Sequence, residues 1–105
     1  MSTPKDIFET RIAAKTGQPD LQKRINAVFR FDLSGPLGGS WIVDFKPATA
    51  GVRQTDEPGE CAVSMTDQDF LGLIERNVDP TMAFLSGRIK VTGDMMLAMR
   101  LGKMF

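Results

Sequence analysis

Hydrophobic and polar positions change their period several times along this chain, and these changes divide it into helices and strands. Residues 4–16 and 19–25 place apolar side chains at helical spacing, and each stretch begins with a proline, which suits a first helical turn. Residues 27–34 and 41–46 then alternate apolar and polar positions, as half-buried strands do. The loop SGPLGG between them predicts that the two strands form an antiparallel hairpin.

The second half of the chain repeats both patterns. We expect a strand near residues 52–55, an exposed acidic turn at 56–60 and a fourth strand at 61–65. Thr66 begins a further helix, and Asp79-Pro80 begins another, which Gly87 ends. Residues 88–92 give a fifth strand before the last helix. The predicted fold class is α+β: a five-stranded, mostly antiparallel sheet with helices packed on one face, in a single domain over residues 1–105.

Composition narrows the classes of partner and compartment. Lys+Arg and Asp+Glu both number 13, so no basic excess is available to neutralise phosphates, and we expect no nucleic-acid partner. No run of about 20 apolar residues is present that would span a membrane. The N-terminus lacks the pattern of a secretory signal. One cysteine cannot form an internal disulfide, which is typical of a reducing compartment, and we expect a cytoplasmic protein.

Catalytic and metal-binding sites are hard to build from these residues. The chain has no histidine, which removes His-based triads, proton shuttles and histidine metal ligands. Cys61 lies in an apolar alternation, where we expect it to pack. Asp67, Asp69, Asp79 and Asp94 all stand where helices begin, and we interpret them as caps of free N–H groups. We therefore expect no enzyme and no bound cofactor or metal.

The last helical stretch, residues 94–105, is apolar on most of its circumference. Arg100 and Lys103 are its only charged residues after Asp94, whereas a helix that packs on a core needs a single apolar stripe. Five of the seven methionines follow Pro80, and methionine suits surfaces that accept varied apolar shapes. Either a partner subunit covers the surplus apolar surface or the domain encloses a cavity. The residues alone leave both open.

Two segments carry a resemblance to a known family. The hairpin VFRFDLSGPLGGSWIVDF and the run CAVSMTDQDFLGLIERNVDPTMAFLSGRIKVTGDMMLAMRL closely resemble the sterol carrier protein 2 family of lipid-binding domains, over about residues 5–105. The resemblance implies a five-stranded sheet with helices on one side, enclosing an apolar tunnel for sterols, fatty acids, acyl-CoAs or phospholipids. The chain departs from the family pattern at Arg76-Asn77. Its C-terminal GKMF is no peroxisomal address, so we expect no peroxisomal role.

The resemblance and the apolar excess together predict non-catalytic lipid binding and transfer, with the last helix and one sheet face as tunnel walls. Arg88, Lys90, Arg100 and Lys103 are expected to hold the mouth near the anionic headgroups of a membrane. One alternative is an accessory domain that presents an isoprenoid or acyl intermediate to partner enzymes. Another is a homo-oligomer joined through the last helix, and we expect a monomer or a weak dimer. An enzyme of lipid metabolism is a third, which lacks a visible nucleophile–base pair. The expected lipid-binding residues are Phe31, Leu33, Trp41, Val43, Phe70, Ile74, Phe84, Met95, Met96 and Met99.

Overall fold

The structure, a computed structural model, describes the backbone of residues 3–102 and the side chains of residues 3–100. Its elements follow the order that the sequence pattern predicts. They are α1 (Pro4–Ile7), η1 (Phe8–Ile12), α2 (Ala13–Thr16), α3 (Pro19–Ile25), β1 (Val28–Ser34), β2 (Gly39–Asp44), β3 (Gly51–Gln54), β4 (Cys61–Thr66), α4 (Asp67–Ile74), α5 (Pro80–Leu85), β5 (Lys90–Gly93) and α6 (Met95–Gly102).

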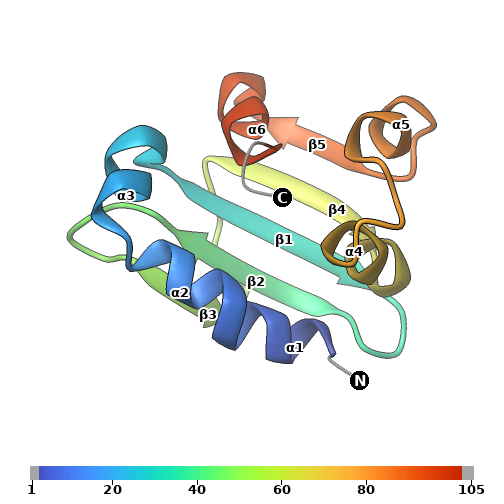
Figure 1. Ribbon diagram of the computed structural model, residues 1–105, viewed down its shortest axis with the longest axis horizontal. Helices are drawn as coiled ribbons and strands as arrows, with labels where there is room; N and C mark the ends of the chain where they lie inside the picture. The colour runs from blue at the N-terminus through green and yellow to red at the C-terminus, as the bar shows by residue number, and fades with distance from the viewer. Residues whose placement is uncertain (1–2, 103–105) are drawn as a thin grey trace.

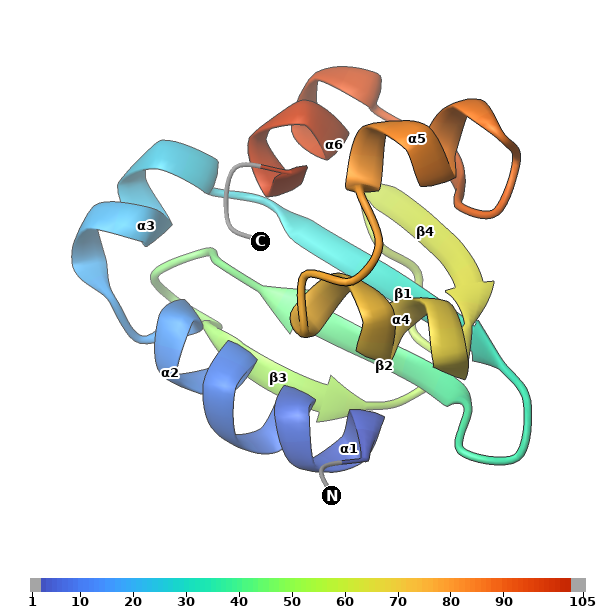
Figure 2. The same ribbon diagram turned by 45° about the vertical axis from the view of Figure 1, so that its right-hand side comes forward.

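The five strands form one open sheet in the order β3-β2-β1-β4-β5. Three of its pairings are antiparallel, and β1 pairs with β4 in parallel. The helices gather on one face of this sheet, with α1 to α3 over one end and α5 and α6 along the β5 edge (Figures 1 and 2). The predicted five-stranded, mostly antiparallel α+β fold is therefore confirmed, and the sheet does not close into a barrel.

The N-terminal helix supplies an aromatic side chain that fills much of the space over β1 and β2. Phe8 is fully buried, and its ring stacks on Trp41 and on Phe70 at centroid distances of 4.8 and 4.7 Å. It also meets Phe31 edge to face at 5.5 Å. Contacts between aromatic rings at these distances stabilise a core beyond the burial of their area. Aromatic side chains therefore occupy the space beneath the N-terminal helix.

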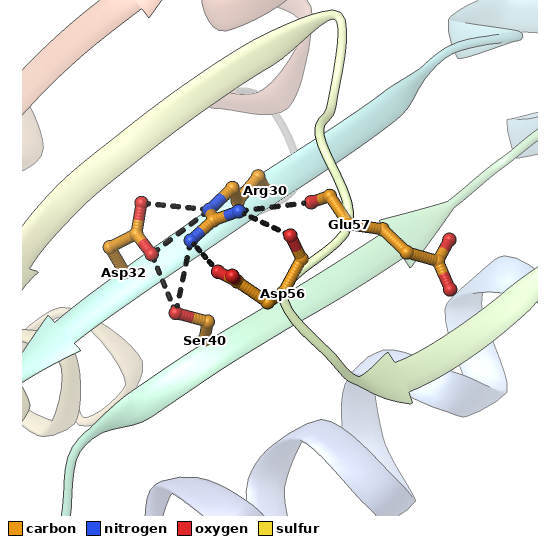
Figure 3. A network of polar contacts seen from close by, with 5 residues as sticks. All are labelled: Arg30, Asp32, Ser40, Asp56 and Glu57. Atoms are coloured by element: carbon orange, nitrogen blue, oxygen red, sulfur yellow. Dashed lines mark hydrogen bonds and ion pairs between the residues drawn. The ribbon is translucent and has the colours of Figure 1, made fainter.

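The connection from β3 to β4 has to cross the sheet, because β2 and β1 lie between these two strands. It crosses on the face that carries no helices. Arg30 holds this crossover in place (Figure 3). Its guanidinium donates to the main-chain carbonyls of Asp56 and Glu57 at 2.9 and 3.2 Å, and to the Asp56 carboxylate at 2.6 Å. Asp32 accepts from the same side chain at 3.0 Å. The hydrogen bonds from Arg30 to Asp56 and Asp32 raise the pKa of the guanidinium above its ordinary value.

Several element boundaries differ from the predicted ones by one or two residues, among them both ends of β2. β5 begins at Lys90, two residues later than expected, because the N–H groups of Arg88 and Ile89 both donate to the Ala83 carbonyl and close the end of α5. Gly87 lies at φ +83°, a conformation that favours glycine, so its predicted role in ending α5 is confirmed. The last helix begins at Met95, and residues 103–105 of the predicted stretch lie outside the described residues.

Candidate functional site

An apolar cavity of about 260 Å³ lies between the sheet and the helices α4, α5 and α6. It lies over the β4–β5 side of the sheet, and Phe31, which contacts the ring of Phe8, also lines the cavity. Among the side chains of residues 3–100 that surround it, only that of Thr81 is polar. The cavity is lined by Phe31, Val63, Met65, Leu73, Pro80, Thr81, Phe84, Ile89, Val91, Met95, Ala98 and Met99.

The floor of the cavity is a row of side chains from three neighbouring strands. Phe31 of β1 is paired with Val63 of β4, and Val63 is paired with Val91 of β5. Successive side chains of a strand point to opposite faces, so this register places all three on the face that carries the helices. Polar neighbours such as Arg30 and Ser64 consequently face the opposite side. The alternation of the sequence therefore determines the chemistry of the floor.

The roof consists of the short helices α5 and α6, and each begins with an aspartate cap. Asp79 accepts from the Thr81 N–H and Asp94 accepts from the Met96 N–H, both at 2.9 Å. These bonds satisfy N–H groups that a helix leaves free at its start. The predicted capping role of both aspartates is confirmed. The roof is thus fixed at its helix N-termini by side chains that take no part in lining the cavity.

The other two aspartates at helix starts bond elsewhere. Asp67 is buried and accepts from the Leu37 N–H at 2.9 Å, which ties the β1–β2 loop to the start of α4. It also accepts from the next residue's N–H at 2.8 Å. Asp69 forms an ion pair with Arg88, and the N-cap of α4 is Thr66, whose hydroxyl accepts from the Asp69 N–H at 3.0 Å. These carboxylates are therefore structural, and no group of described residues has the composition of a metal site.

The cavity is open to solvent at a rim between α5 and α6. Phe84, Met95 and Met99 line the cavity and yet expose 43%, 47% and 68% of their surface. A side chain that faces both an apolar cavity and water marks the mouth through which an apolar ligand would pass. The rim lies over the β5 edge of the sheet, where α5 lies beside the start of β5 and α6 beside its end (Figure 1).

The ten residues that the sequence suggested for lipid binding separate into three groups. Phe31, Phe84, Met95 and Met99 line the cavity. Met96 lies outside it, with 65% of its surface exposed. The others belong to the hydrophobic core or pack against it, and two of them, Trp41 and Phe70, stack on the ring of Phe8. This last group comprises Leu33, Trp41, Val43, Phe70 and Ile74.

The sequence pattern did not identify eight of the residues that line the cavity, including all of those on β4 and β5. The alternations at 61–65 and 88–92 were visible, and they indicated which side chains share a face. They did not indicate that the described side chains leave a cavity over this part of the sheet. The missed residues are Val63, Met65, Leu73, Pro80, Thr81, Ile89, Val91 and Ala98.

The described residues contain no helix long and apolar enough to cross a bilayer. Cys61, expected to pack, is fully buried in the core. Burial raises the pKa of its thiol, and the nearby charge of Asp94 adds to the effect. A buried thiol whose pKa is raised is a poor nucleophile, in agreement with a packing role.

The chain is similar in sequence to known proteins over nearly all of its length. It is 36% identical to hydroxysteroid dehydrogenase-like protein 2 of Pongo abelii, covering 90% of this chain and 23% of that protein. It is 32% identical to human sterol carrier protein 2, covering 95% of this chain and 20% of that protein. The chain thus spans about a fifth of the length of these curated relatives.

Solved structures agree with the sequence comparisons. The solution structure of palmitated SCP2L2 from Aedes aegypti superposes with a TM-score of 0.81 at 26% identity, covering 98% of this chain and 94% of that one. The profile of the SCP-2 sterol transfer family matches residues 8–105. With its fold and nearly its whole length in agreement, the chain belongs to the SCP-2 sterol transfer family.

Proposed function

We propose that this chain binds the hydrocarbon tail of a fatty acid or similar single-chain lipid in the cavity beneath α5 and α6, and transfers it between membranes. Domains of this family are generally non-catalytic and bind and transfer lipids. The observation that carries the proposal is the cavity that the described side chains leave unfilled; one of the twelve described residues that line it is polar. Protein interiors are otherwise packed to the density of organic crystals, so an apolar hollow of this size is retained at a cost in stability.

The size and lining of the cavity favour a single alkyl chain. Its volume of about 260 Å³ lies just below the range of about 300–1,000 Å³ in which pockets enclose most of a drug-sized ligand. No charged side chain among the described residues lines it, so a carboxylate or phosphate head would remain at the rim. The palmitate named for the Aedes aegypti relative is a ligand of this shape, a long alkyl chain with one charged end.

The energetics favour transfer over permanent storage. Moving a methylene group out of water gains about 0.8 kcal/mol, so about ten methylenes in the cavity gain roughly 8 kcal/mol before ordering costs are subtracted. A bilayer interior is equally apolar, and the difference between cavity and bilayer is therefore close to zero. Lipid then exchanges in both directions, and the protein removes the aqueous barrier that separates two membranes.

Ligand binding is tested with purified protein and a fluorescent fatty acid in the absence of membranes. Native mass spectrometry first determines whether lipid co-purifies with the chain. Ala98→Arg places a charge in the cavity wall at a partly buried position and should abolish binding, because an unpaired charge is costly in an apolar site. Met96→Arg is the matched control, since Met96 lies on the same helix outside the cavity. Wild-type protein that carries no lipid and leaves the probe's emission unchanged would contradict the proposal.

A further inference from the structure

Methionine sulfur is the readily oxidised group that the described part of this protein exposes. The chain has one cysteine, one tryptophan and seven methionines, and it has neither histidine nor tyrosine. Cys61, Trp41 and Met65 are all buried in the core. The other methionines whose side chains the structure describes are exposed: Met82, Met95, Met96 and Met99. A thiolate is ordinarily more reactive than a thioether, but here the thiol is shielded, so an oxidant in solution meets methionine sulfur.

Two of these four exposed methionines belong to the cavity and two do not. Met95 and Met99 line it at the rim, and we call them the rim pair. Because residues i and i+4 of a helix share a face, both lie on the same face of α6. Met82 and Met96 do not line the cavity, and we call them the outer pair. The outer pair exposes 63% and 65% of its surface, so the two pairs are comparably accessible and differ in their relation to the cavity.

A hydroperoxide converts a thioether into a sulfoxide by transferring one oxygen atom. A sulfur lone pair attacks the terminal peroxide oxygen and the O–O bond breaks. The proton of the transferred hydroxyl moves to the departing oxygen, which leaves as water from hydrogen peroxide or as an alcohol from an organic hydroperoxide. Sulfur loses two electrons and the peroxide gains them. The reaction needs only an accessible sulfur, and it replaces an apolar group by a strongly polar S=O group.

We propose that the rim pair is a modification site at which hydroperoxides weaken lipid binding by forming methionine sulfoxide. This inference rests on the lipid binding proposed above. The S=O group accepts hydrogen bonds from water, and an alkyl chain that enters the cavity past Met95 and Met99 removes part of that water. Among the described residues that line the cavity, Thr81 alone has a polar side chain, so the wall offers little to replace the lost hydration. Sulfoxide formation at the rim pair should therefore raise Kd about tenfold, in the lower part of the range for burying an unpaired polar group.

A tenfold change in affinity is large enough to unload the protein. Cavity and bilayer hold an alkyl chain with similar free energy, so the distribution of lipid between them responds to a small change in either. A protein that is half occupied in equilibrium with membranes becomes about one-tenth occupied when its affinity falls tenfold. Methionine sulfoxide reductases return the sulfoxide to the thioether, so the modification is reversible. Bound lipid in turn covers the rim pair and should protect it from oxidation.

The test treats the full chain with hydrogen peroxide, removes the peroxide with catalase and titrates the fluorescent fatty acid. The rim variant, Met95→Leu/Met99→Leu, lacks both rim sulfurs and keeps side chains of similar volume. The matched control, Met82→Leu/Met96→Leu, loses the same number of exposed sulfurs outside the cavity. Each protein is compared with its own untreated sample, which separates oxidation from any direct effect of leucine.

Treatment should raise Kd about tenfold for the wild type and for the control, and it should leave Kd of the rim variant unchanged. Methionine sulfoxide reductases A and B should restore the treated wild type. Emission from Trp41, which is buried in the core, verifies that each treated protein is still folded.

A second measurement needs only the wild type. Fragment mass spectrometry follows the added oxygen at each methionine, with and without saturating palmitate. Palmitate should slow oxidation of Met95 and Met99 and leave the rate at Met82 and Met96 unchanged.

Three results would overturn the proposed modification site. The first is a wild type whose rim pair is oxidised while Kd stays unchanged, and the second is a rim variant that loses as much affinity as the wild type. The third is a rim pair that peroxide does not oxidise or that palmitate does not protect. A wild type that binds no fatty acid before treatment contradicts the proposed function, and this inference with it, whereas equal binding before and after treatment contradicts this inference alone.

Discussion

Filling the cavity should make this protein more stable and less able to bind lipid. Ala98 lies on α6 and lines the cavity, and it is partly buried. The substitution Ala98→Phe directs a phenyl ring into a space that the wild type leaves open. In an ordinary core the larger side chain would cause strain, because no room exists for it. Here the room exists, so stability and binding should change in opposite directions.

The magnitudes follow from the volume. At about 24 cal/mol per Å³, an enclosed cavity of about 260 Å³ would correspond to about 6 kcal/mol of lost stability, an upper limit for a cavity with an open mouth. A single cavity-filling substitution commonly recovers about 0.5–2 kcal/mol. For a domain of this length each kcal/mol raises Tm by about 4–8 °C. If the ring displaces about four methylenes of the ligand, the loss is about 3 kcal/mol, or roughly 200-fold in Kd.

The assay combines thermal unfolding of the ligand-free protein with titration of a fluorescent fatty acid. Ala14→Phe is the matched control, because Ala14 is exposed on α2 and far from the cavity. That variant should leave both Tm and Kd close to those of the wild type. An Ala98→Phe protein that unfolds at a higher temperature and still binds with wild-type affinity would refute the assignment of the cavity as the binding site.

Two further predictions concern the rest of the fold. Arg30→Gln should release the crossover at residues 55–60, because it removes the guanidinium that donates to Asp56 and Glu57. Amide hydrogen exchange should accelerate in these residues, while the affinity for the fluorescent fatty acid should not change. Unchanged exchange would contradict the role of Arg30. Cys61 has a pKa raised above its ordinary value of 9.0, so the folded protein should react slowly with iodoacetamide at pH 7–9. The neutral Cys61 thiol should contribute to the free energy of unfolding fully below the pKa of the unfolded chain. This contribution should be lost as pH rises through the pKa of the folded protein, and Cys61→Ala should not show that loss at alkaline pH.

The connection from β3 to β4 has a structural role that the sequence pattern did not indicate. The acidic stretch 56–60 looked like a solvated turn, and no local pattern connected it with Arg30. In the structure the chain must pass over the sheet to pair β4 with β1 in parallel, and a charged side chain on the open face is within reach of its carbonyls. A parallel pairing always requires such a connection, but its partners lie far apart in sequence.

The sequence by itself determined the elements, their order and their faces, because the period of apolar positions and the capping residues are local properties of the chain. It also determined that the C-terminal third would be too apolar for an ordinary surface. Only the tertiary structure decided where the unfilled volume lies. Phe8 fills the space over Trp41 and Phe70, and no side chain of comparable size in the described part of the chain fills the space over Val63 and Val91. Which helix covers which strand depends on packing between distant segments, and alternation along a strand cannot express it.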